Sequence, residues 1–262
     1  MPAFAILWLL AQERPSSLAD EGLAGWMLHA RVRAHYPRLE GGLKGEADEP
    51  TVGLDDDLDL ESPRWTPMYE AAVFWTGHSA LHGVGISGWS FATSGRETLD
   101  SDEIFQDHLF PAGTPLRSRF RFETFGLDGI WAQRHDPREL FRLQASVGVH
   151  YLEAEVRLSG PAGSESEEYS DGNLRFALAA EFRPVGWAFA GLSGAVYTDV
   201  LSWFAGVDSG HYAMEVEALG GFQWGPVRID GGYRVFGWTL RWTKSEIDLL
   251  TYGPTASVSV RF

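Results

Sequence analysis

The sequence predicts an all-β fold, a transmembrane, antiparallel, up-and-down β-barrel of about ten strands. Three observations predict it. Apolar and polar residues alternate with a period of two in most segments from Trp26 to the last residue. The connections between these segments alternate between long and short along the chain. Arginine and glutamate occupy much of the polar side of the alternating segments.

The composition limits the classes of function. The chain has 262 residues, a net charge of −15, 30 glycines, 13 prolines and no cysteine. Its glycine, proline and aromatic content is typical of a turn-rich β protein. The lack of cysteine excludes disulfides and thiolate metal sites, and we expect no cofactor and no metal. The negative charge argues against nucleic acid as a partner, because phosphate binding needs a basic surface.

Residues 1–20 are predicted to be a signal peptide or another N-terminal segment. The apolar run Ala3–Ala11 has about the length of a signal-peptide hydrophobic region, although no basic residue precedes it. No stretch approaches the ~18 consecutive apolar residues of a membrane-spanning helix. The barrel is therefore expected over residues 24–262.

The first predicted strand begins at Trp26 and shows the alternation most clearly. Its polar side carries His29, Arg31, Arg33 and His35, so this side must face water or acidic groups. Similar alternation recurs near 116–123, 141–151, 174–182, 212–218, 227–235 and 256–262.

Five long connections and several short ones separate the strands. Short joins are predicted near 77–80, 183–186 and 225–226, with a longer one at 127–139. This alternation is typical of a membrane barrel with tight turns at one end and long loops at the other. It gives ten strands, but eight or twelve remain open because the phase of alternation changes within 68–96. The long loops are predicted at 37–67, 95–113, 159–172, 202–210 and 237–250.

One hairpin has a register that can be derived. With Gly225 and Pro226 as its two-residue loop, Trp224 opposes Val227 and Glu217 opposes Arg234. Apolar residues then share one face and charged residues share the other.

Aromatic spacing and inward charge favour a membrane barrel over a soluble sandwich. Trp26 and Tyr36, and likewise Trp187 and Tyr197, are ten residues apart, which corresponds to about 25 Å across a tilted barrel wall. A sandwich core does not accommodate many charges, whereas a polar lumen hydrates and pairs them. The predicted lumen charge network consists of Arg31, Arg33, Arg117, Arg119, Arg121, Glu123, Arg142, Glu153, Glu155, Glu181, Glu215, Glu217, Arg228, Asp230 and Arg234.

The last strand resembles the assembly signal of bacterial outer-membrane β-barrel proteins. Ala256, Val258 and Val260 alternate before a terminal Phe262. With the strand and loop pattern, the chain resembles the small barrel group of OmpA-like and OmpW-like proteins, without a matching subfamily. The resemblance implies an outer-membrane location with periplasmic termini. It also implies contact with the insertion machinery during assembly, and with outer-membrane lipid and lipopolysaccharide afterwards.

The sequence leaves several alternatives open for the function of the barrel. Ten strands leave little more than room for side chains, so the lumen arginines and glutamates form either a charge-paired plug or the lining of a narrow pore. A structural or lipid-interacting role without catalysis is expected. One alternative is a surface hydrolase that uses Asp199, Asp208 and His211 at the loop rim, with Asp248 and His108 in other loops.

The other alternative is a protein that binds a surface partner through its loops, especially 37–67 and 95–113. The first of these loops holds an acidic group, for which we expect a solvated surface, with weak divalent-cation binding as the alternative. The residues of this acidic group are Asp55, Asp56, Asp57, Asp59 and Glu61.

Overall fold

In the computed structural model the described residues are 25–44, 51–54, 58–60, 64–77, 80–100, 102–105, 108–133, 140–161, 163–199, 212–241 and 246–262. Nearly all of them lie in antiparallel β-strands. Within this part of the chain no helix is long and apolar enough to cross a membrane. The predicted N-terminal segment 1–20 lies outside the described residues.

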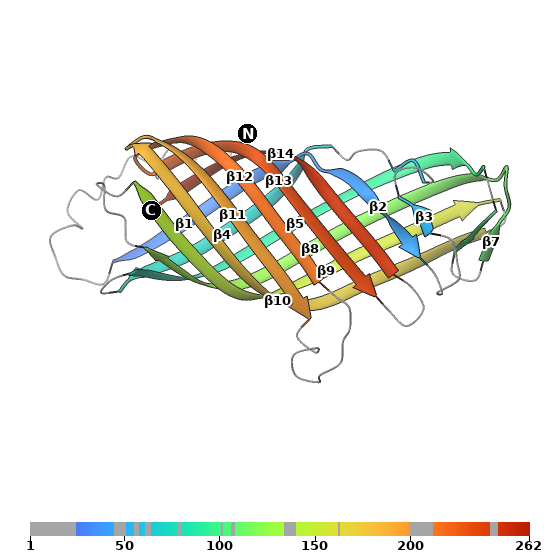
Figure 1. The fold of residues 1–262 in the computed structure, drawn as a ribbon, viewed down its shortest axis with the longest axis horizontal. Helices are drawn as coiled ribbons and strands as arrows, with labels where there is room; N and C mark the ends of the chain where they lie inside the picture. Colours follow the sequence, from blue (N-terminus) through green and yellow to red (C-terminus); the bar gives the residue numbers. More distant parts are fainter. Residues whose placement is uncertain are drawn as a thin grey trace.

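Ten antiparallel strands close into a barrel (Figure 1). In barrel order they are β1 (Trp26–His35), β4 (Thr66–Thr76), β5 (Ala80–Thr98), β8 (Pro115–Gln133), β9 (Phe141–Gly160), β10 (Gly163–Val185), β11 (Ala188–Asp199), β12 (Tyr212–Trp224), β13 (Val227–Arg241) and β14 (Glu246–Arg261). Pairing of β1 with β14 completes the ring, with Ala30 opposite Val260. The predicted ten-stranded, up-and-down antiparallel barrel is confirmed.

Four short strands lie between β1 and β8 in the chain. β2 (Arg38–Lys44) continues along β14 beyond the end of β1, and β3 (Thr51–Gly53) pairs with β2. β6 (Glu103–Phe105) and β7 (His108–Phe110) form a separate two-stranded sheet. The segments predicted as loops 37–67 and 95–113 therefore contain strands as well as connections.

The two ends of the barrel differ. Trp26 and Phe262 lie at one end, the terminal end, where the backbone N–H of Leu28 donates to the carbonyl of Phe262. The tight turns after β10 and β12 also lie at this end. The opposite end is the distal end.

The β12–β13 hairpin has the predicted register, with Glu217 opposite Arg234.

Four adjacent strands are much longer than a membrane crossing requires. β5 has 19 residues, β8 has 19, β9 has 20 and β10 has 23, whereas about 9–11 residues cross a bilayer. In Figure 1 the green and yellow strands among them reach far to the right, beyond the ends of β13 and β14. Their distal halves form a projection from the barrel.

This extension corrects two predicted loops. The polar segment 159–172 is strand rather than loop for most of its length, because β9 and β10 pair as far as Gly160 and Gly163. Segment 237–250 is also mostly strand, since β13 and β14 pair up to Arg241 and Glu246. Polar residues indicated loops, but here they form the water-facing side of long strands. Segment 202–210 lies outside the described residues.

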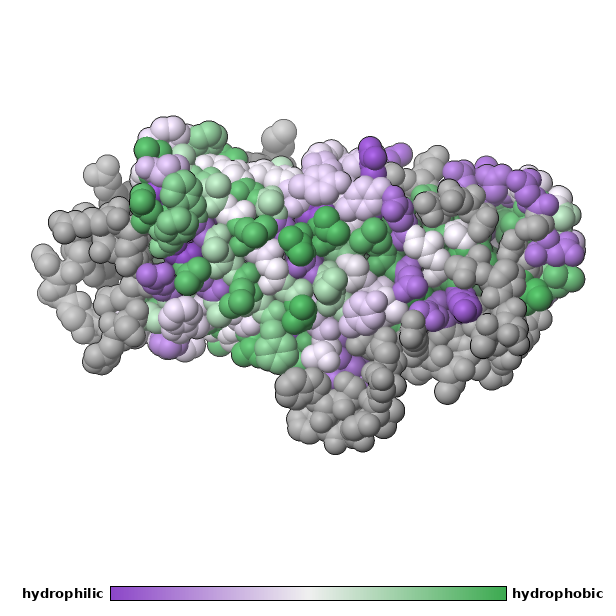
Figure 2. All heavy atoms as spheres, viewed as in Figure 1, coloured by the Kyte–Doolittle hydropathy of each residue, from purple (hydrophilic) through white to green (hydrophobic). Residues whose placement is uncertain are grey.

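The outer face carries an apolar belt around the terminal half of the barrel. On β9 the outward residues from Phe141 to Tyr151 are all apolar or aromatic. Phe141 and Tyr151 are ten residues apart, which corresponds to about 25 Å along the barrel axis and matches the thickness of a hydrocarbon layer. Aromatic pairs border the belt at the terminal end, including Trp26 with Trp75 at 5.7 Å between ring centroids. Figure 2 shows apolar side chains gathered over this half and hydrophilic ones toward the distal end.

Beyond the belt, both faces of the strands reverse their polarity. On β8 the outward side chains change from Phe125 and Leu127 within the belt to Arg121 and Arg119 beyond it. The inward side chains change in the opposite sense, from Asp128 to Phe122 and Phe120. The alternation itself is unbroken across this point, so the same side of the strand faces inward throughout.

The reversal lies at the same level on the next strand. Phe125 pairs with Tyr151 of β9, and Glu123 pairs with Glu153. Inward residues of β9 are polar up to His150 and apolar from Leu152 onward. The distal half is therefore built like a soluble β-barrel, with an apolar interior and a charged exterior.

The reversal overturns part of the predicted lumen network. Six predicted lumen residues lie on the outer face instead, namely Arg117, Arg119, Arg121, Glu123, Glu153 and Glu155. The error arose because the apolar row of segment 116–122 was assigned to lipid, whereas it packs in a dry interior. Tyr197 also points inward and is buried, so Trp187 and Tyr197 do not bracket the belt.

Single cysteines test the reversal, because the chain contains no cysteine of its own. In the folded barrel, Arg119→Cys is expected to react quickly with a water-soluble maleimide, since Arg119 is exposed. Phe120→Cys is expected to react only after unfolding, because Phe120 is 0% exposed. Mass spectrometry of the labelled barrel measures both. Rapid labelling at position 120 with protection at 119 would place the faces the other way round.

Candidate functional site in the barrel interior

The interior of the barrel is filled in two layers. The distal layer, here called the apolar plug, consists of buried side chains from most strands of the barrel and from β2 and β3. Phe120 and Phe122 of β8 are 0% exposed, and Phe236 and Trp238 of β13 are 1% exposed. Trp89 lies 5.2 Å from Phe122 and 6.1 Å from Phe236 between ring centroids. The described side chains of this layer pack against one another as in the core of a water-soluble protein.

A segment after β3 covers the plug from within the distal end. Leu54 and Leu58 are 0% and 1% exposed and belong to the same apolar cluster. The hydroxyl of Ser118 on β8 donates to the carbonyl of Leu58 at 2.6 Å, which ties the segment to the inner wall. The backbone of Leu58 and Asp59 also lies directly against the inner side of Gly95, where any Cβ would collide with it. The sequence did not predict that these leucines are buried, because the acidic residues around them indicated a solvated loop.

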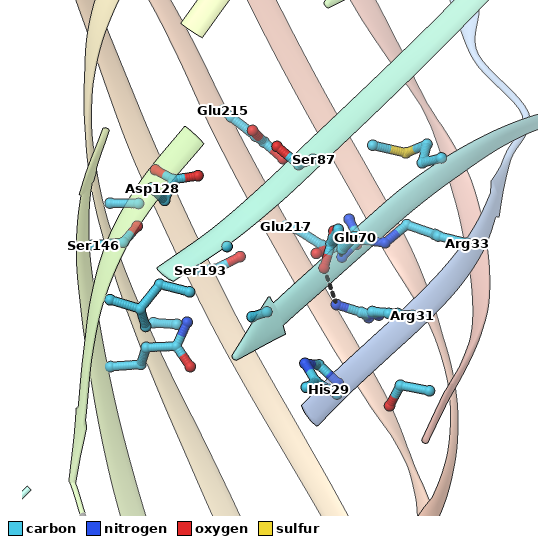
Figure 3. A pocket seen from close by; sticks show the side chains of 18 of the residues that line it. His29, Arg31, Arg33, Glu70, Ser87, Asp128, Ser146, Ser193, Glu215 and Glu217 are labelled. Carbon is cyan, nitrogen blue, oxygen red and sulfur yellow. Dashed lines mark ion pairs between the residues drawn. The ribbon is translucent and has the colours of Figure 1, made fainter. Parts of the chain in front are cut away.

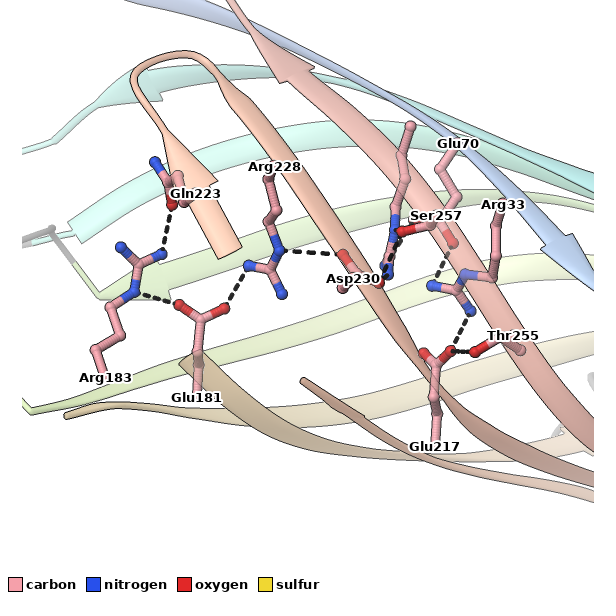
Figure 4. A network of polar contacts seen from close by, with 11 residues as sticks. Arg33, Glu70, Glu181, Arg183, Glu217, Gln223, Arg228, Asp230, Thr255 and Ser257 are labelled. Atoms are coloured by element: carbon pink, nitrogen blue, oxygen red, sulfur yellow. Dashed lines mark hydrogen bonds and ion pairs between the residues drawn. The ribbon is translucent and has the colours of Figure 1, made fainter. Parts of the chain in front are cut away.

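The terminal layer is a network of ion pairs, here called the charge network (Figure 4). Arg33 lies between Glu217 at 2.9 Å and Glu70 at 3.1 Å. Arg31 contacts Asp230 at 2.6 Å and the same Glu70 at 3.7 Å. These contacts join β1, β4, β12 and β13 across the lumen.

The network continues toward the terminal end. Arg228 contacts Asp230 at 3.2 Å and also pairs with Glu181. Glu181 pairs in turn with Arg183, which donates to the side-chain oxygen of Gln223 at 3.0 Å. Glu70, Asp230 and Glu181 therefore each pair with two arginines, and sharing of this kind offsets the cost of removing charges from water.

A second group lies closer to the plug. Arg175 contacts Asp128 at 3.2 Å and donates to the hydroxyl of Tyr197 at 3.1 Å. Tyr197 donates to Glu215 at 2.9 Å, and Arg234 also donates to Glu215, at 2.8 Å.

His150 completes this group and needs a glycine beside it. One of its ring nitrogens lies 3.0 Å from a carboxylate oxygen of Asp128. The ring lies over Gly126 of the neighbouring strand, where an added Cβ would overlap it. Gly126 thus leaves the space in which this histidine packs.

A cavity of about 280 Å³ lies among these side chains (Figure 3). His29, Arg31 and Glu70 line it on one side, and Ser146 and Ser193 line it on the other. Trp89 lines it as well, so the cavity reaches the plug. At ~30 Å³ per water it has room for about nine waters. Among the described residues no group of three or more histidines and carboxylates is arranged to hold a metal ion.

The structure places nine predicted network residues on the inner face. They are Arg31, Arg33, Arg142, Glu181, Glu215, Glu217, Arg228, Asp230 and Arg234. It adds interior partners that the sequence analysis missed, including Glu70, Asp128, Arg175, Arg183 and Tyr197. The inward position of Arg175 and Arg183 could have been predicted, because they alternate in register with Glu181 on the same strand. The inward position of Asp128 could not, because its segment was interpreted as a connection.

The residues of the hydrolase alternative are only partly described. His108 lies 3.8 Å from Glu165, and Asp248 accepts a hydrogen bond from Thr239 at 2.6 Å. Asp199 is buried at the end of β11. Asp208 and His211 lie outside the described residues, as do Asp55, Asp56, Asp57 and Glu61 of the acidic group.

The last strand has the alternation that was predicted for it. The side chains of Ala256 and Val258 are exposed on the outer face, and Ser257 and Ser259 are buried on the inner face. Val260 lies opposite Ala30 at the closure of the ring, and Phe262 follows at the terminal end.

Comparison with known proteins gives a fold. No protein-family model and no curated protein matches the chain. Among solved structures, the outer-membrane protease OmpT from Escherichia coli matches with a TM-score of 0.52 at 11% identity, covering 92% of this chain and 99% of that one. The Yersinia pestis protein Ail matches with a TM-score of 0.36 at 11% identity, covering 90% of this chain and 99% of that chain. OprG from Pseudomonas aeruginosa also has a TM-score of 0.36, at 8% identity, covering 91% and 96%.

Among these three, the match to OmpT supports the same fold, a small outer-membrane β-barrel. The expected resemblance to this group is confirmed, and no subfamily emerges. At these identities the likeness concerns the fold alone.

Arg33 provides a test of the charge network. Arg33→Met leaves the carboxylates of Glu70 and Glu217 without their shared cation in a low-dielectric interior, which is expected to cost about 3–5 kcal/mol of stability. The matched control is Arg121→Met on the outer face, where the exposed pair with Glu123 contributes about 0–1 kcal/mol. The urea midpoint of the heat-shifted gel band in micelles measures both. Equal losses in the two variants would contradict a stabilising network, and adding Glu217→Gln to Arg33→Met is expected to restore part of the loss.

Proposed function

We propose that this protein is a closed, non-conducting barrel of the bacterial outer membrane that holds a rigid β-sheet projection outside the cell. The observation that carries the proposal is the filled interior. The apolar plug occupies the distal half and the charge network spans the terminal half. A barrel whose distal half is packed with apolar side chains transports nothing along its axis, so its outer surface is left to carry the function.

The outer-membrane location is supported by the apolar belt and its aromatic borders. The belt is about 25 Å high on β9, and a water-soluble protein rarely exposes so continuous an apolar surface. Its neighbours in the belt are then outer-membrane lipids. The final strand, ending at Phe262, is the segment that the insertion machinery would read.

The orientation is supported by the different ends of the barrel. Outer-membrane barrels have short turns on the periplasmic side and longer elements outside. The two-residue turns Gly186–Trp187 and Gly225–Pro226 are at the terminal end, and the four long strands project from the distal end. The termini are therefore periplasmic and the projection is external.

A structural and binding role fits this arrangement better than a pore or an enzyme. The predicted narrow pore would need a hydrated path past Trp89, Phe122 and Phe236, which pack against one another. No catalysis is proposed. The projection places a rigid, charged sheet beyond the membrane, where it contacts other molecules of the cell surface.

Conductance recordings test the closed barrel. Refolded protein is inserted into planar bilayers, and insertion is verified by the heat-induced shift of its gel band. We expect no stepwise conductance, because the plug excludes water and ions. A known porin reconstituted in the same bilayers serves as the positive control. Regular conductance steps from the wild-type barrel would contradict the proposal.

A further inference from the structure

The outer face of the projection carries a cluster of four exposed arginines, here called the arginine cluster. It consists of Arg96 on β5, Arg117 and Arg119 on β8, and Arg157 on β9. Arg96 lies directly opposite Arg117, and Arg119 lies directly opposite Arg157. Like charges in directly opposed positions destabilise a sheet, so two such pairs side by side need an explanation.

Carboxylates do not neutralise this cluster within the described residues. None of the four arginines forms an ion pair there, and Arg157 donates instead to the hydroxyl of Ser164 at 3.3 Å. Arg121, two residues nearer the belt, differs because it bonds Glu123 at 2.6 Å and lies opposite Glu155. The cluster therefore forms a local excess of positive charge on a chain whose net charge is −15.

The surroundings of the cluster are polar and concave. A groove of about 610 Å³ runs beside it, lined by Arg96, Arg117 and Ser159 among others. Glu97 also lines the groove, where its carboxylate accepts the backbone N–H of Thr98 at 3.1 Å. Four outward positions next to the arginines bear hydroxyl groups, and Glu155, which lies opposite Arg121, follows on the same face of β9 two residues from Arg157. The four hydroxyl-bearing positions are Ser94, Ser159, Ser164 and Ser166.

This chemistry fits a saccharide that carries several phosphate groups. The planar guanidinium binds phosphate oxygens in a bidentate manner, and serine hydroxyls hydrogen-bond to sugar hydroxyls. Opposed residues are about 5 Å apart across strands, and alternate residues are about 7 Å apart along one. Charges at these intervals match phosphates on neighbouring sugar rings better than one isolated phosphate.

The height of the cluster above the belt identifies the source of the saccharide. Arg119 and Arg117 lie six and eight residues before Phe125, which is at the edge of the belt on β8. On a tilted strand this corresponds to about 15–20 Å above the hydrocarbon layer, beyond the phosphates of a lipid headgroup. Outward side chains of a barrel point sideways from its axis, so the arginines face the layer of sugars around the barrel and not the medium above it.

We propose that the arginine cluster binds the phosphorylated core saccharide of lipopolysaccharide in the surrounding leaflet. This inference rests on the proposed external orientation of the distal end. Binding there fastens the projection to the sugar layer and offsets the repulsion between the opposed arginines.

The test replaces all four arginines together, as Arg96→Gln, Arg117→Gln, Arg119→Gln and Arg157→Gln. All four side chains are exposed, so the barrel is expected to fold normally, which its heat-shifted gel band verifies. Binding of fluorescent lipopolysaccharide with a complete phosphorylated core is measured by titration in micelles. We expect at least a tenfold weaker affinity in the quadruple variant. The matched control, Arg121→Gln on the same face, is expected to change it less than about threefold.

Three probes distinguish the sources of the anion. Lipopolysaccharide with the core is expected to bind more tightly than lipid A alone, and more tightly than a soluble sulfated saccharide. Equal binding of lipid A would assign the interaction to headgroup phosphates and overturn the inference. Preference for the sulfated saccharide would assign the cluster to an external ligand and also overturn it. Unchanged affinity in the quadruple variant, or an equal loss in Arg121→Gln, would do the same.

Conductance of the same preparations separates the two proposals. If the barrel does not conduct and its arginine cluster does not bind the core saccharide, this inference is overturned and the proposed closed barrel still stands. A conducting barrel overturns the proposed function, whatever its affinity for saccharide.

Discussion

The structure depends on one constraint, which is that ring closure fixes the side on which every residue of a strand lies. Once β1 pairs with β14, residues of one parity face the interior along the whole length of each strand. In the proposed membrane placement, the medium outside changes from lipid to water partway along β5, β8, β9 and β10. The outward residues must follow that change, and the inward residues must then change in the opposite sense to give each half a stable interior. The charge network and the apolar plug are the two results of this one requirement.

The two layers meet at Trp89, which takes part in both. Its ring packs against Phe122 and Phe236 on the side of the plug. The guanidinium of Arg234, from the charge network, lies 4.5 Å from the centre of the same ring, a favourable cation–π distance. The indole N–H of Trp89 donates to the hydroxyl of Thr66 at 3.1 Å. An amphipathic side chain at the junction thus satisfies its polar atom while it separates the cavity beside the charge network from the apolar plug.

A filled interior moves the functional question to the outer surface. In the terminal half this surface is uniformly apolar, which fits lipid. In the distal half this surface carries separate groups of like charge. Arginines of β5, β8 and β9 lie opposite one another. Nearer the belt, glutamates lie opposite glutamates, as in Glu123 with Glu153 and Glu155 with Glu168. Such like-charge pairs cost stability in isolation, so they are better explained by molecules that contact this surface than by folding.

The sequence by itself determined the barrel and its closing strand, because period-two alternation and paired turns are local properties of the chain. It predicted about ten strands and left eight and twelve open, and ring closure in the structure decided for ten. The sequence also determined the register of the β12–β13 hairpin and the inward position of residues such as Arg33 and Glu217. Only the tertiary structure decided on which side Arg119 and Glu155 lie, because an alternating strand has the same pattern whether its apolar face meets lipid or a dry core. It also decided that Leu54 and Leu58 enter the barrel among acidic residues. Both results depend on the surroundings of a segment in the folded barrel, and residues far away in the chain supply those surroundings.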